Sequence, residues 1–301
     1  MVTKDAAITI EKLSKRYGAG QKFAVKDLSL QVMPGEVYGF LGPNGAGKST
    51  TIRLMMNFIF PSGGRASILG KDAVKDSVEV KRQVGYLAGE IALYQKMTGR
   101  QLLDYLSQLH PGSRRYISEL AERFQADLDA RIRDLSKGNR QKIGLIQAFM
   151  HKPKVLILDE PTSGLDPLMQ EEFFGLLKET TKTGGSVFFS SHNLAEVQRI
   201  CDRIGFIREG ELIAEQTIAD IAQAAARTFD ITFIDKAPAA DLRAISGASV
   251  SVKNGRQATV GLRGDLSPLF KVLAKHKVAS ITQRELNLED EFMHLYKGDG
   301  Q

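Results

Sequence analysis

The stretch Gly42-Pro43-Asn44-Gly45-Ala46-Gly47-Lys48-Ser49-Thr50 decides the fold of this chain. It fits the pattern G-x-x-x-x-G-K-[ST] and lies between a short apolar run at 37–41 and a segment of helical pattern that starts at Lys48. Glycines let the backbone wrap around phosphate groups with its N–H groups pointing inward, and the positive end of the following helix dipole lies at the same point. The stretch therefore predicts a phosphate-binding loop between a buried strand and a helix.

Two side chains of this loop carry its chemistry. Lys48 is expected to reach the β- and γ-phosphates of a nucleotide, and the Ser49 hydroxyl is expected to bind Mg²⁺. The other loop residues that we expect to contact the nucleotide are Gly42, Asn44, Gly45, Gly47 and Thr50. The loop thus predicts a bound nucleoside triphosphate together with Mg²⁺.

A second apolar run, at 155–158, ends in the two carboxylates Asp159 and Glu160. Because open α/β sheets bind ligands at the carboxyl ends of their strands, we expect these side chains beside the phosphate loop. Asp159 suits coordination of Mg²⁺ through water, and Glu160 suits polarising an attacking water. Loop and carboxylates together predict an enzyme that hydrolyses a nucleotide.

Short apolar runs alternate with helical patterns up to about residue 210. The apolar runs predict strands, and a period of 3.6 residues predicts helices. Predicted strands lie at 7–10, 28–32, 37–41, 83–88, 155–158, 186–190 and 204–208, and predicted helices at 48–60, 98–109, 118–123, 137–150 and 167–182. This alternation favours an α/β fold with a parallel or mixed sheet flanked by helices.

The pattern changes after an alanine-rich stretch at 222–227. Strands and helices then follow in the order β-α-β-β-α-β, with Asn254-Gly255 as a hairpin signal and a last predicted helix at 289–296. We therefore predict two domains, a nucleotide-binding domain at 1–225 and a small accessory or regulatory α+β domain, ferredoxin-like in its element order, at 228–301. A loosely organised tail packed on the first domain is the alternative.

Three further stretches carry a resemblance to one family. Leu135-Ser136-Lys137-Gly138-Asn139 precedes a predicted helix, Ser163-Gly164-Leu165-Asp166 follows Glu160, and His192 follows the predicted strand at 186–190. With the phosphate loop and the Asp-Glu pair, they run in the order of the signature loop, D-loop and switch histidine of ABC-type ATPases. From about residue 7 to 220 the chain resembles the ATP-binding subunit of an ABC transporter, especially the bacterial ABC-2 exporter type that works with a separate permease.

The resemblance implies a fold, a ligand and an assembly. The fold is a P-loop ABC-type ATPase core with a helical insertion at about 88–135, which would contact the membrane permease. The ligand is ATP with Mg²⁺, and the active unit is a homodimer, or a heterodimer with a related ATPase, that holds two ATP molecules head to tail. In such a dimer, ATP binding and hydrolysis power transport, with export favoured over import.

The resemblance also assigns roles to single residues. Tyr17 matches the aromatic residue that stacks on adenine, and His192 matches the histidine near the γ-phosphate. Glu160 and His192 would be the catalytic residues. Ser136 and Gly138 would face the phosphates of the partner subunit's ATP, and Asp166 would lie at the dimer interface.

Two departures from the family pattern stand out. The signature stretch usually reads Leu-Ser-Gly-Gly-Gln, whereas this chain has Lys137 and Asn139. We expect the Lys137 side chain to face outward and Asn139 to keep a hydrogen-bonding role. The Q-loop glutamine is also missing near position 89, where Gly89-Glu90 stands, so Glu90 is a candidate Mg²⁺ ligand in its place.

Composition limits the other possibilities. The 301 residues are 43% hydrophobic and 25% charged, which predicts a globular chain with a real core. The net charge of +6 comes from 41 basic and 35 acidic residues interspersed along the chain, so we expect no nucleic-acid partner. A single cysteine, Cys201, fits a reducing compartment.

No apolar run reaches the length of a membrane helix, and the first residues show no signal-peptide pattern. We therefore expect a cytoplasmic protein that is peripheral on the inner face of the cell membrane. Two other classes compete with this reading. The first is a soluble ABC-type ATPase acting on ribosomes or nucleic acid, which would typically carry two cassettes or a coiled coil. The second is a metabolic P-loop kinase, whose activity would not require the signature stretch.

Overall fold

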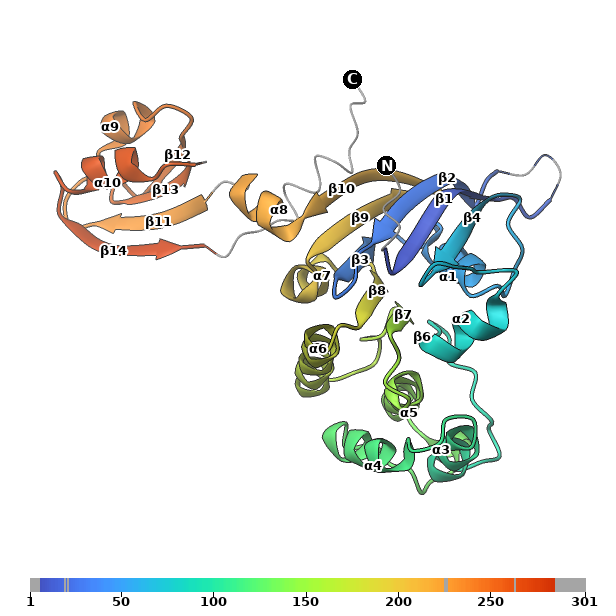
Figure 1. Ribbon diagram of the computed structural model, residues 1–301. Helices are drawn as coiled ribbons and strands as arrows, with labels where there is room; N and C mark the ends of the chain where they lie inside the picture. Colours follow the sequence, from blue (N-terminus) through green and yellow to red (C-terminus); the bar gives the residue numbers. More distant parts are fainter. Residues whose placement is uncertain (1–5, 19, 21, 225–226, 263, 285–301) are drawn as a thin grey trace. The chain divides into compact units, whose positions relative to one another are not determined.

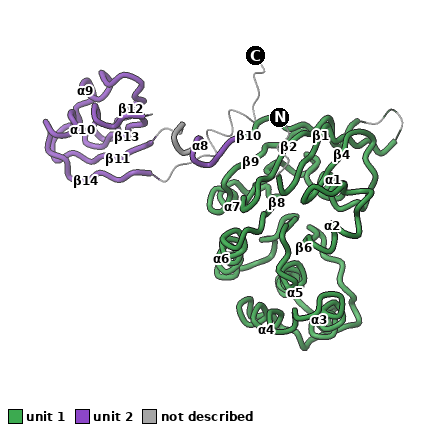
Figure 2. The backbone as a smooth tube through the Cα atoms, viewed as in Figure 1, with its two compact units in different colours: residues 1–215 green, residues 216–301 purple. Residues whose placement is uncertain are grey.

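The computed structural model describes residues 6–18, 20, 22–224, 227–262 and 264–284. The chain divides into two compact units, residues 1–215 and 216–301 (Figure 2). The units meet in sequence ten residues before the predicted boundary at 225, because helix α8 (Ile218–Ala224) belongs with the second unit. Whether the second unit acts as a separate domain stays a prediction.

The larger sheet of the first unit has strands in the order β10-β9-β3-β8-β7-β6 (Figure 1). Their bounds are β3 (Val37–Leu41), β6 (Val84–Leu87), β7 (Val155–Asp159), β8 (Ser186–Ser191), β9 (Arg203–Arg208) and β10 (Glu211–Thr217). From β9 to β6 the neighbouring strands run parallel. Strands β3, β8 and β7 are adjacent, so the segments that follow their carboxyl ends meet at one edge of the sheet.

A second sheet is antiparallel, with strands in the order β2-β1-β4-β5. Its strands are β1 (Ile8–Lys15), β2 (Val25–Val32), β4 (Gly63–Ile68) and β5 (Lys71–Asp72). Helix α1 (Lys48–Met55) contacts β4 of this sheet and β7 of the larger one. Side chains from both sheets and from α1 form one buried core, which includes Ile8, Phe40 and Ile52. The phosphate loop therefore starts from a strand, and ends in a helix, that are both fixed in this core.

Further helices of the first unit pack on the larger sheet. Helices α2 (Ser77–Gln83) and α5 (Lys137–Phe149) contact β6, α6 (Pro167–Lys182) contacts β8, and α7 (Leu194–Ile200) contacts β3. Between β6 and α5 the chain forms α3 (Gly99–Ser107), α4 (Arg114–Arg123) and the short 3₁₀ turn η1 (Ile132–Asp134), which lie together with α5 in Figure 1. These elements make up the predicted helical insertion.

In its described residues the second unit contains an antiparallel sheet and the short helices α8, α9 and α10. After α8 come β11 (Arg227–Phe233), α9 (Ala239–Arg243), β12 (Ser249–Lys253), β13 (Gln257–Leu262), α10 (Ser267–Leu273) and β14 (Val278–Gln283). The order β12-β13-β11-β14 and the antiparallel pairing match the ferredoxin-like arrangement that the sequence predicts. Its core is separate from that of the first unit and includes Phe229, Ile231 and Val260. The helix predicted at 289–296 lies outside the described residues.

Several elements differ from the sequence prediction, and helices α2, α7 and α8 are not predicted at all. Helix α1 ends at Met55 rather than near residue 60, because Asn57 has a φ of 49°, a left-handed conformation that stops a helix. Strand β4 is not predicted, because the two glycines at its start indicate a turn. Strand β10 was not predicted, because its alternation is dominated by exposed polar side chains.

Candidate nucleotide-binding site

The phosphate loop has a backbone that only glycine allows at its key positions. Gly45 has a φ of 81° and Gly47 a φ of 112°, and both values lie in the left-handed region. A Cβ atom at Gly47 would lie 2.5 Å from the carbonyl oxygen of Ala24, and one at Gly42 would lie 2.4 Å from that of Ile207. The loop is therefore packed closely against neighbouring backbone, which fixes its shape.

The ammonium group of Lys48 lies inside this loop. Lys48 is the first residue of α1 and is almost fully buried, with 6% of its surface exposed. Its Nζ donates hydrogen bonds to the carbonyl oxygens of Gly42 at 2.7 Å and Pro43 at 3.2 Å, and lies 3.4 Å from Oε1 of Glu160. The structure thus brings the predicted phosphate-binding lysine and the predicted catalytic carboxylate together.

Asp159 is the last residue of strand β7 and Glu160 follows it, and Ser190 of β8 forms hydrogen bonds with both. The Ser190 hydroxyl donates to Oδ1 of Asp159 at 2.5 Å, and the Glu160 amide donates to Ser190 through its hydroxyl and its carbonyl, each at 3.2 Å. Glu160 has a φ of 49°, an uncommon conformation for a residue with a side chain. These hydrogen bonds keep the Glu160 backbone in that conformation.

His192 stands where the switch histidine was expected. It follows β8, its side chain is exposed, and its Nδ1 lies 2.7 Å from Oε2 of Glu160. The Glu160 carboxylate therefore lies between the Lys48 ammonium and the His192 imidazole, with one oxygen toward each.

These residues line one cleft of about 450 Å³. Its other lining residues are Ala24, Asn44, Gly45, Gly47, Ser49, Thr50, Arg53, Tyr86, Ala88, Gly89, Glu90, Asp159 and Ser163. Burial, followed by the nearby Asp159 carboxylate, raises the pKa of Tyr86, so its phenol stays neutral at ordinary pH. Glu90 is exposed at the cleft, and a Cβ atom at Gly89 would lie 3.1 Å from Oδ2 of Asp159. The segment that replaces the Q-loop therefore borders the carboxylate predicted to bind metal.

Tyr17 lies at the margin of the cleft rather than in its lining. Its hydroxyl is 3.4 Å from Oγ1 of Thr50 in the phosphate loop, and Lys15 Nζ lies 5.4 Å from the centre of its ring. The side chain is 56% exposed, which leaves its ring accessible next to the loop.

Ser136, Gly138 and Asp166 do not line the cleft of their own subunit, whereas Ser163, the first residue of the D-loop, does. Ser136 caps α5 by accepting a hydrogen bond from the Asn139 amide, and Asp166 caps α6 by accepting one from the Met169 amide. Gly138 lies directly against the D-loop, since a Cβ atom there would be 2.6 Å from the carbonyl oxygen of Gly164. Of the predicted site residues, Ser136, Gly138 and Asp166 therefore form a second group at the starts of two helices.

The side chains of the two unusual signature residues have defined partners. Lys137 is exposed, as predicted, and its Nζ also donates to the Ser163 hydroxyl at 2.9 Å. Asn139 exchanges two hydrogen bonds with the backbone of Asp127, at 2.8 and 2.9 Å. One substitution thus connects the signature loop to the D-loop, and the other connects it to the helical insertion.

Sequence reasoning missed several residues of the cleft. Arg53, five residues after Lys48 on α1, and Tyr86 of β6 line it, while Ser190 of β8 is outside the lining and donates a hydrogen bond to Asp159. Ser190 could have been found, since a polar residue near the end of an apolar strand, two positions before His192, points to the same sheet edge. The chain itself gives no such signal for Arg53.

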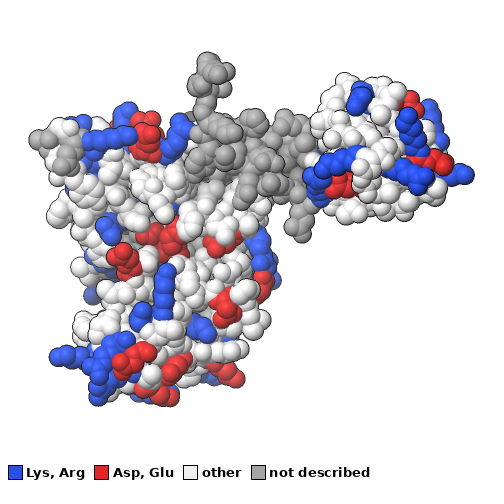
Figure 3. Space-filling view, turned by 180° about the vertical axis from the view of Figure 1, so that it is seen from behind, with Lys and Arg blue, Asp and Glu red and all other residues white. Residues whose placement is uncertain are grey.

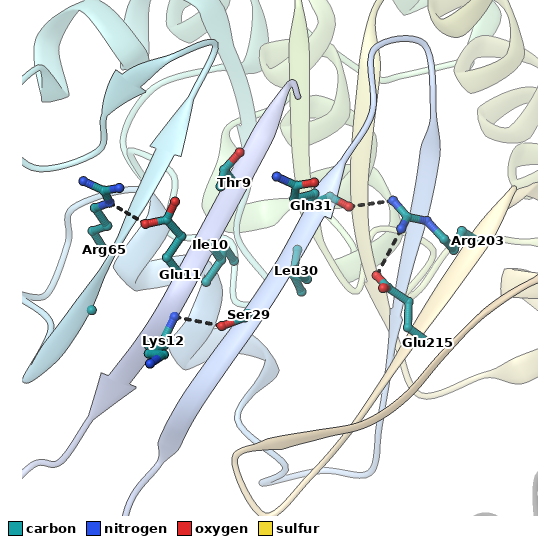
Figure 4. A pocket seen from close by; sticks show the side chains of 11 residues that line it. Thr9, Ile10, Glu11, Lys12, Ser29, Leu30, Gln31, Arg65, Arg203 and Glu215 are labelled. Atoms are coloured by element: carbon teal, nitrogen blue, oxygen red, sulfur yellow. Dashed lines mark hydrogen bonds and ion pairs between the residues drawn. The ribbon is translucent and has the colours of Figure 1, made fainter. Parts of the chain in front are cut away.

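A larger cavity, of about 800 Å³, lies elsewhere on the first unit. It covers parts of β1, β2 and β4 and reaches Arg203 and Glu215 (Figure 4). Four of its charged side chains are paired, Arg65 with Glu11 at 2.6 Å and Arg203 with Glu215 at 3.4 Å. It contains none of the residues predicted from the sequence, and we assign it no part in nucleotide binding.

Charged residues of both signs are interspersed on the face drawn in Figure 3, which shows no large area of Lys and Arg alone. Within the described part of the chain, no helix combines the length and the apolar character needed to cross a membrane.

Comparisons with known proteins agree with this geometry. A family model described as ABC transporter matches residues 25–163. The ABC transporter ATP-binding protein NatA of Bacillus subtilis (strain 168) is 35% identical over 236 residues, which cover 75% of this chain and 96% of that protein. The bacitracin transport ATP-binding protein BcrA of Enterococcus faecalis is 30% identical over 308 residues, or 100% of this chain and 99% of that protein.

Among solved structures, that of an ATP binding subunit of an ABC transporter superposes with a TM-score of 0.66 and 29% identity. The match covers 71% of this chain and 91% of that one. The phosphate loop and the carboxylates Asp159 and Glu160 lie within the residues that the family model matches. By its fold, its cleft and its relatives, the chain belongs to the ABC transporter family, as an ATP-binding ATPase subunit.

Proposed function

We propose that this ATPase works as a head-to-tail dimer that encloses two Mg-ATP and drives export through a separate membrane permease. One observation carries the proposal. Lys48, Glu160 and His192 meet in one cleft, while the signature residues Ser136 and Gly138 do not line it. A second subunit that brings its own signature loop to this cleft would supply the missing side of the nucleotide site.

The cleft suits a magnesium ion beside the triphosphate. Ser49 and Asp159 both line it and offer a hydroxyl and a carboxylate, the hard oxygen ligands that Mg²⁺ prefers. In the described residues no cluster of three or more acidic, histidine or cysteine side chains could hold a metal alone. Phosphate oxygens and water would therefore complete the coordination, and Glu90 is a further candidate ligand. The ion would neutralise charge on the phosphates during transfer.

The remaining residues divide between binding and hydrolysis. Lys48 would neutralise the β- and γ-phosphates, and the backbone from Gly42 to Gly47, with Asn44 and Thr50, would surround them. Glu160 would polarise the attacking water, held in place by its neighbours Lys48 and His192. The Tyr17 ring would stack on adenine. From the partner subunit, Ser136 and Gly138 would reach the γ-phosphate, and Asp166 would help to position the interface.

Transport and location follow from the relatives and the surface. Similarity to a bacitracin transport protein over the whole chain supports export, and the family supports a permease at the inner face of the cell membrane. In the helical insertion, Tyr94 is 63% exposed and is available for that contact, whereas Ile91 packs toward Gly144 of α5. An ATPase that acts on ribosomes or nucleic acid is not favoured, because these relatives are transport proteins.

Dilution of the purified protein tests the shared sites. If each site needs two subunits, the rate of ATP hydrolysis per subunit should fall as the protein is diluted below its dimerisation constant. Constant activity per subunit at concentrations where sedimentation shows only monomer would contradict the dimer.

Substitution tests the phosphate loop. Lys48→Ala should abolish hydrolysis, while Lys178→Ala, which removes an exposed lysine of α6, should not.

A further inference from the structure

Lys137, which is exposed, contacts the D-loop through its ammonium group and through part of its aliphatic stem. Its Nζ donates to the Ser163 hydroxyl at 2.9 Å. Its stem lies over Gly164, where a Cβ atom would be 3.4 Å from Cγ and 3.5 Å from Cδ of the lysine. The glycine that usually stands at this position of the family's signature stretch could make neither contact. The lysine therefore adds a side-chain link that the usual stretch lacks.

Ser163 connects in turn to the centre of the cleft. It lines the cleft, and its amide donates to the carbonyl oxygen of Glu160 at 3.2 Å. The Glu160 carboxylate lies 2.7 Å from His192 and 3.4 Å from Lys48. Two hydrogen bonds thus separate the signature loop from the residue proposed to polarise water.

The signature loop is held on its other side as well. Asn139 exchanges two hydrogen bonds with the backbone of Asp127 in the helical insertion, and Gly138 leaves room for the carbonyl of Gly164. The first turn of α5 therefore contacts the insertion through Asn139 and the D-loop through Lys137 and Gly138.

We propose that Lys137 is a positioning residue that couples the two ATP sites of the dimer. This inference rests on the proposed function, in which each signature loop serves the partner's nucleotide while Ser163 and Glu160 serve their own. Lys137 would therefore connect, within one subunit, the signature loop that serves the partner's nucleotide to the turn that carries Ser163 and Glu160. When nucleotide shifts the Glu160–Ser163 turn, the lysine shifts the signature loop that faces the other site. Coupling of this kind is reciprocal between the sites.

Steady-state ATP hydrolysis by four proteins tests the link: the wild type, Lys137→Met, Ser163→Ala and the double variant. Lys137→Met should lower kcat about tenfold, equivalent to about 1.4 kcal/mol. Its KM should stay within about twofold of the wild type, because the phosphate loop is untouched. In the Ser163→Ala background, Lys137→Met should have almost no further effect, because its partner is already gone.

Two more variants separate positioning from general damage. Lys137→Arg keeps a charged donor for Ser163 and should restore most of kcat. Lys142→Met removes the same charge from the same helix, five residues further on, and should leave kcat close to that of the wild type. Binding of a fluorescent ATP analogue should be similar in all variants.

The possible failures are distinguishable. Wild-type kcat in Lys137→Met, or an equal tenfold loss from Lys137→Met with and without Ser163, would overturn the coupling while leaving the proposed function intact. A folded wild-type protein that binds no ATP analogue and hydrolyses no ATP would overturn the proposed function, and the coupling with it.

Discussion

Glu160 has an unusual backbone conformation for its residue type. A non-glycine residue in the left-handed region costs of the order of 1–3 kcal/mol, and such conformations persist where the surroundings impose them. Here the surroundings are the two hydrogen bonds from its amide to Ser190 and the adjacent turn to Ser163. The strain orients the carboxylate between Lys48 and His192, which links the backbone conformation to the proposed role in hydrolysis.

Tyr17 allows a test of the proposed adenine contact. Its accessible ring beside Thr50 predicts that Tyr17→Ala weakens ATP binding by about 1–3 kcal/mol, the value of stacking a base on an aromatic ring. Tyr17→Phe should bind ATP nearly as well as the wild type, because it keeps the ring and loses only the hydroxyl contact. Tyr105→Ala, which removes another exposed tyrosine, serves as the control in nucleotide titrations. Equal affinity of Tyr17→Ala and wild type would contradict stacking.

His151 predicts how stability changes with pH. Burial, and then the neighbouring His110, whose ring is stacked 4.3 Å away, lower the pKa of His151 to about 4. Between pH 6.5 and 4 the unfolded chain therefore binds a proton that the folded chain does not, so stability is fully present above pH 6.5 and falls as the pH decreases.

His151→Phe keeps an aromatic ring against His110 and removes this titration. Between pH 7 and pH 4, the free energy of unfolding of the wild type should fall by about 1–2 kcal/mol more than that of the variant. This figure is reduced from the full linkage value because the side chain is partly exposed. Urea unfolding at several pH values measures the difference, and parallel pH profiles for the two proteins would contradict the assignment.

At the scale of elements, the N-terminus of α3 is fixed by a reciprocal pair of hydrogen bonds. Thr98 accepts from the Gln101 amide, and the Gln101 side chain accepts from the Thr98 amide. Thr98→Ala should lower the free energy of unfolding by about 1 kcal/mol, whereas Thr98→Ser, which keeps the hydroxyl, should lower it much less. The urea midpoints of the three proteins measure this, and a Thr98→Ala midpoint equal to that of Thr98→Ser would show that the cap contributes nothing.

Local signals decide which elements a sequence can predict. The helix at 167–182 is predicted to the residue, because Asp166 and Pro167 mark its start and glycines follow its end. Strand β4 is missed, because its two leading glycines indicate a turn and only its pairing with β1 makes it a strand. A short stretch of sequence does not show which distant strand it will pair with, so such strands cannot be predicted from local patterns.

The same distinction holds for the site. The phosphate loop, the carboxylates after β7 and His192 are continuous motifs, so they could be predicted. The contact of Lys137 with Ser163 joins residues 26 positions apart, and it required the direction of one side chain in the folded protein. Ser190 was missed for a similar reason, since its role depends on β8 lying next to β7.

At the scale of the whole molecule, the cleft belongs to one unit. All of its lining residues lie between Ala24 and His192, and the second unit has its own core. A chain that ends at Thr217, after β10, should therefore bind Mg-ATP with the affinity of the full-length protein. Titration of both proteins with a nucleotide analogue measures this. A truncated chain that folds, as judged by circular dichroism, but binds no nucleotide would show that the second unit contributes to the site.

The burial of Cys201 should allow cysteines introduced elsewhere to be labelled selectively. It is the only cysteine of the chain, it is 6% exposed beside β3, and burial raises the pKa of its thiol well above the ordinary value. Thiol-reactive probes attack the thiolate, so the native protein should resist them. A cysteine introduced at an exposed position in each unit could then carry a fluorophore pair without removal of a native residue. The separation of the two units could be followed by energy transfer through the ATP cycle.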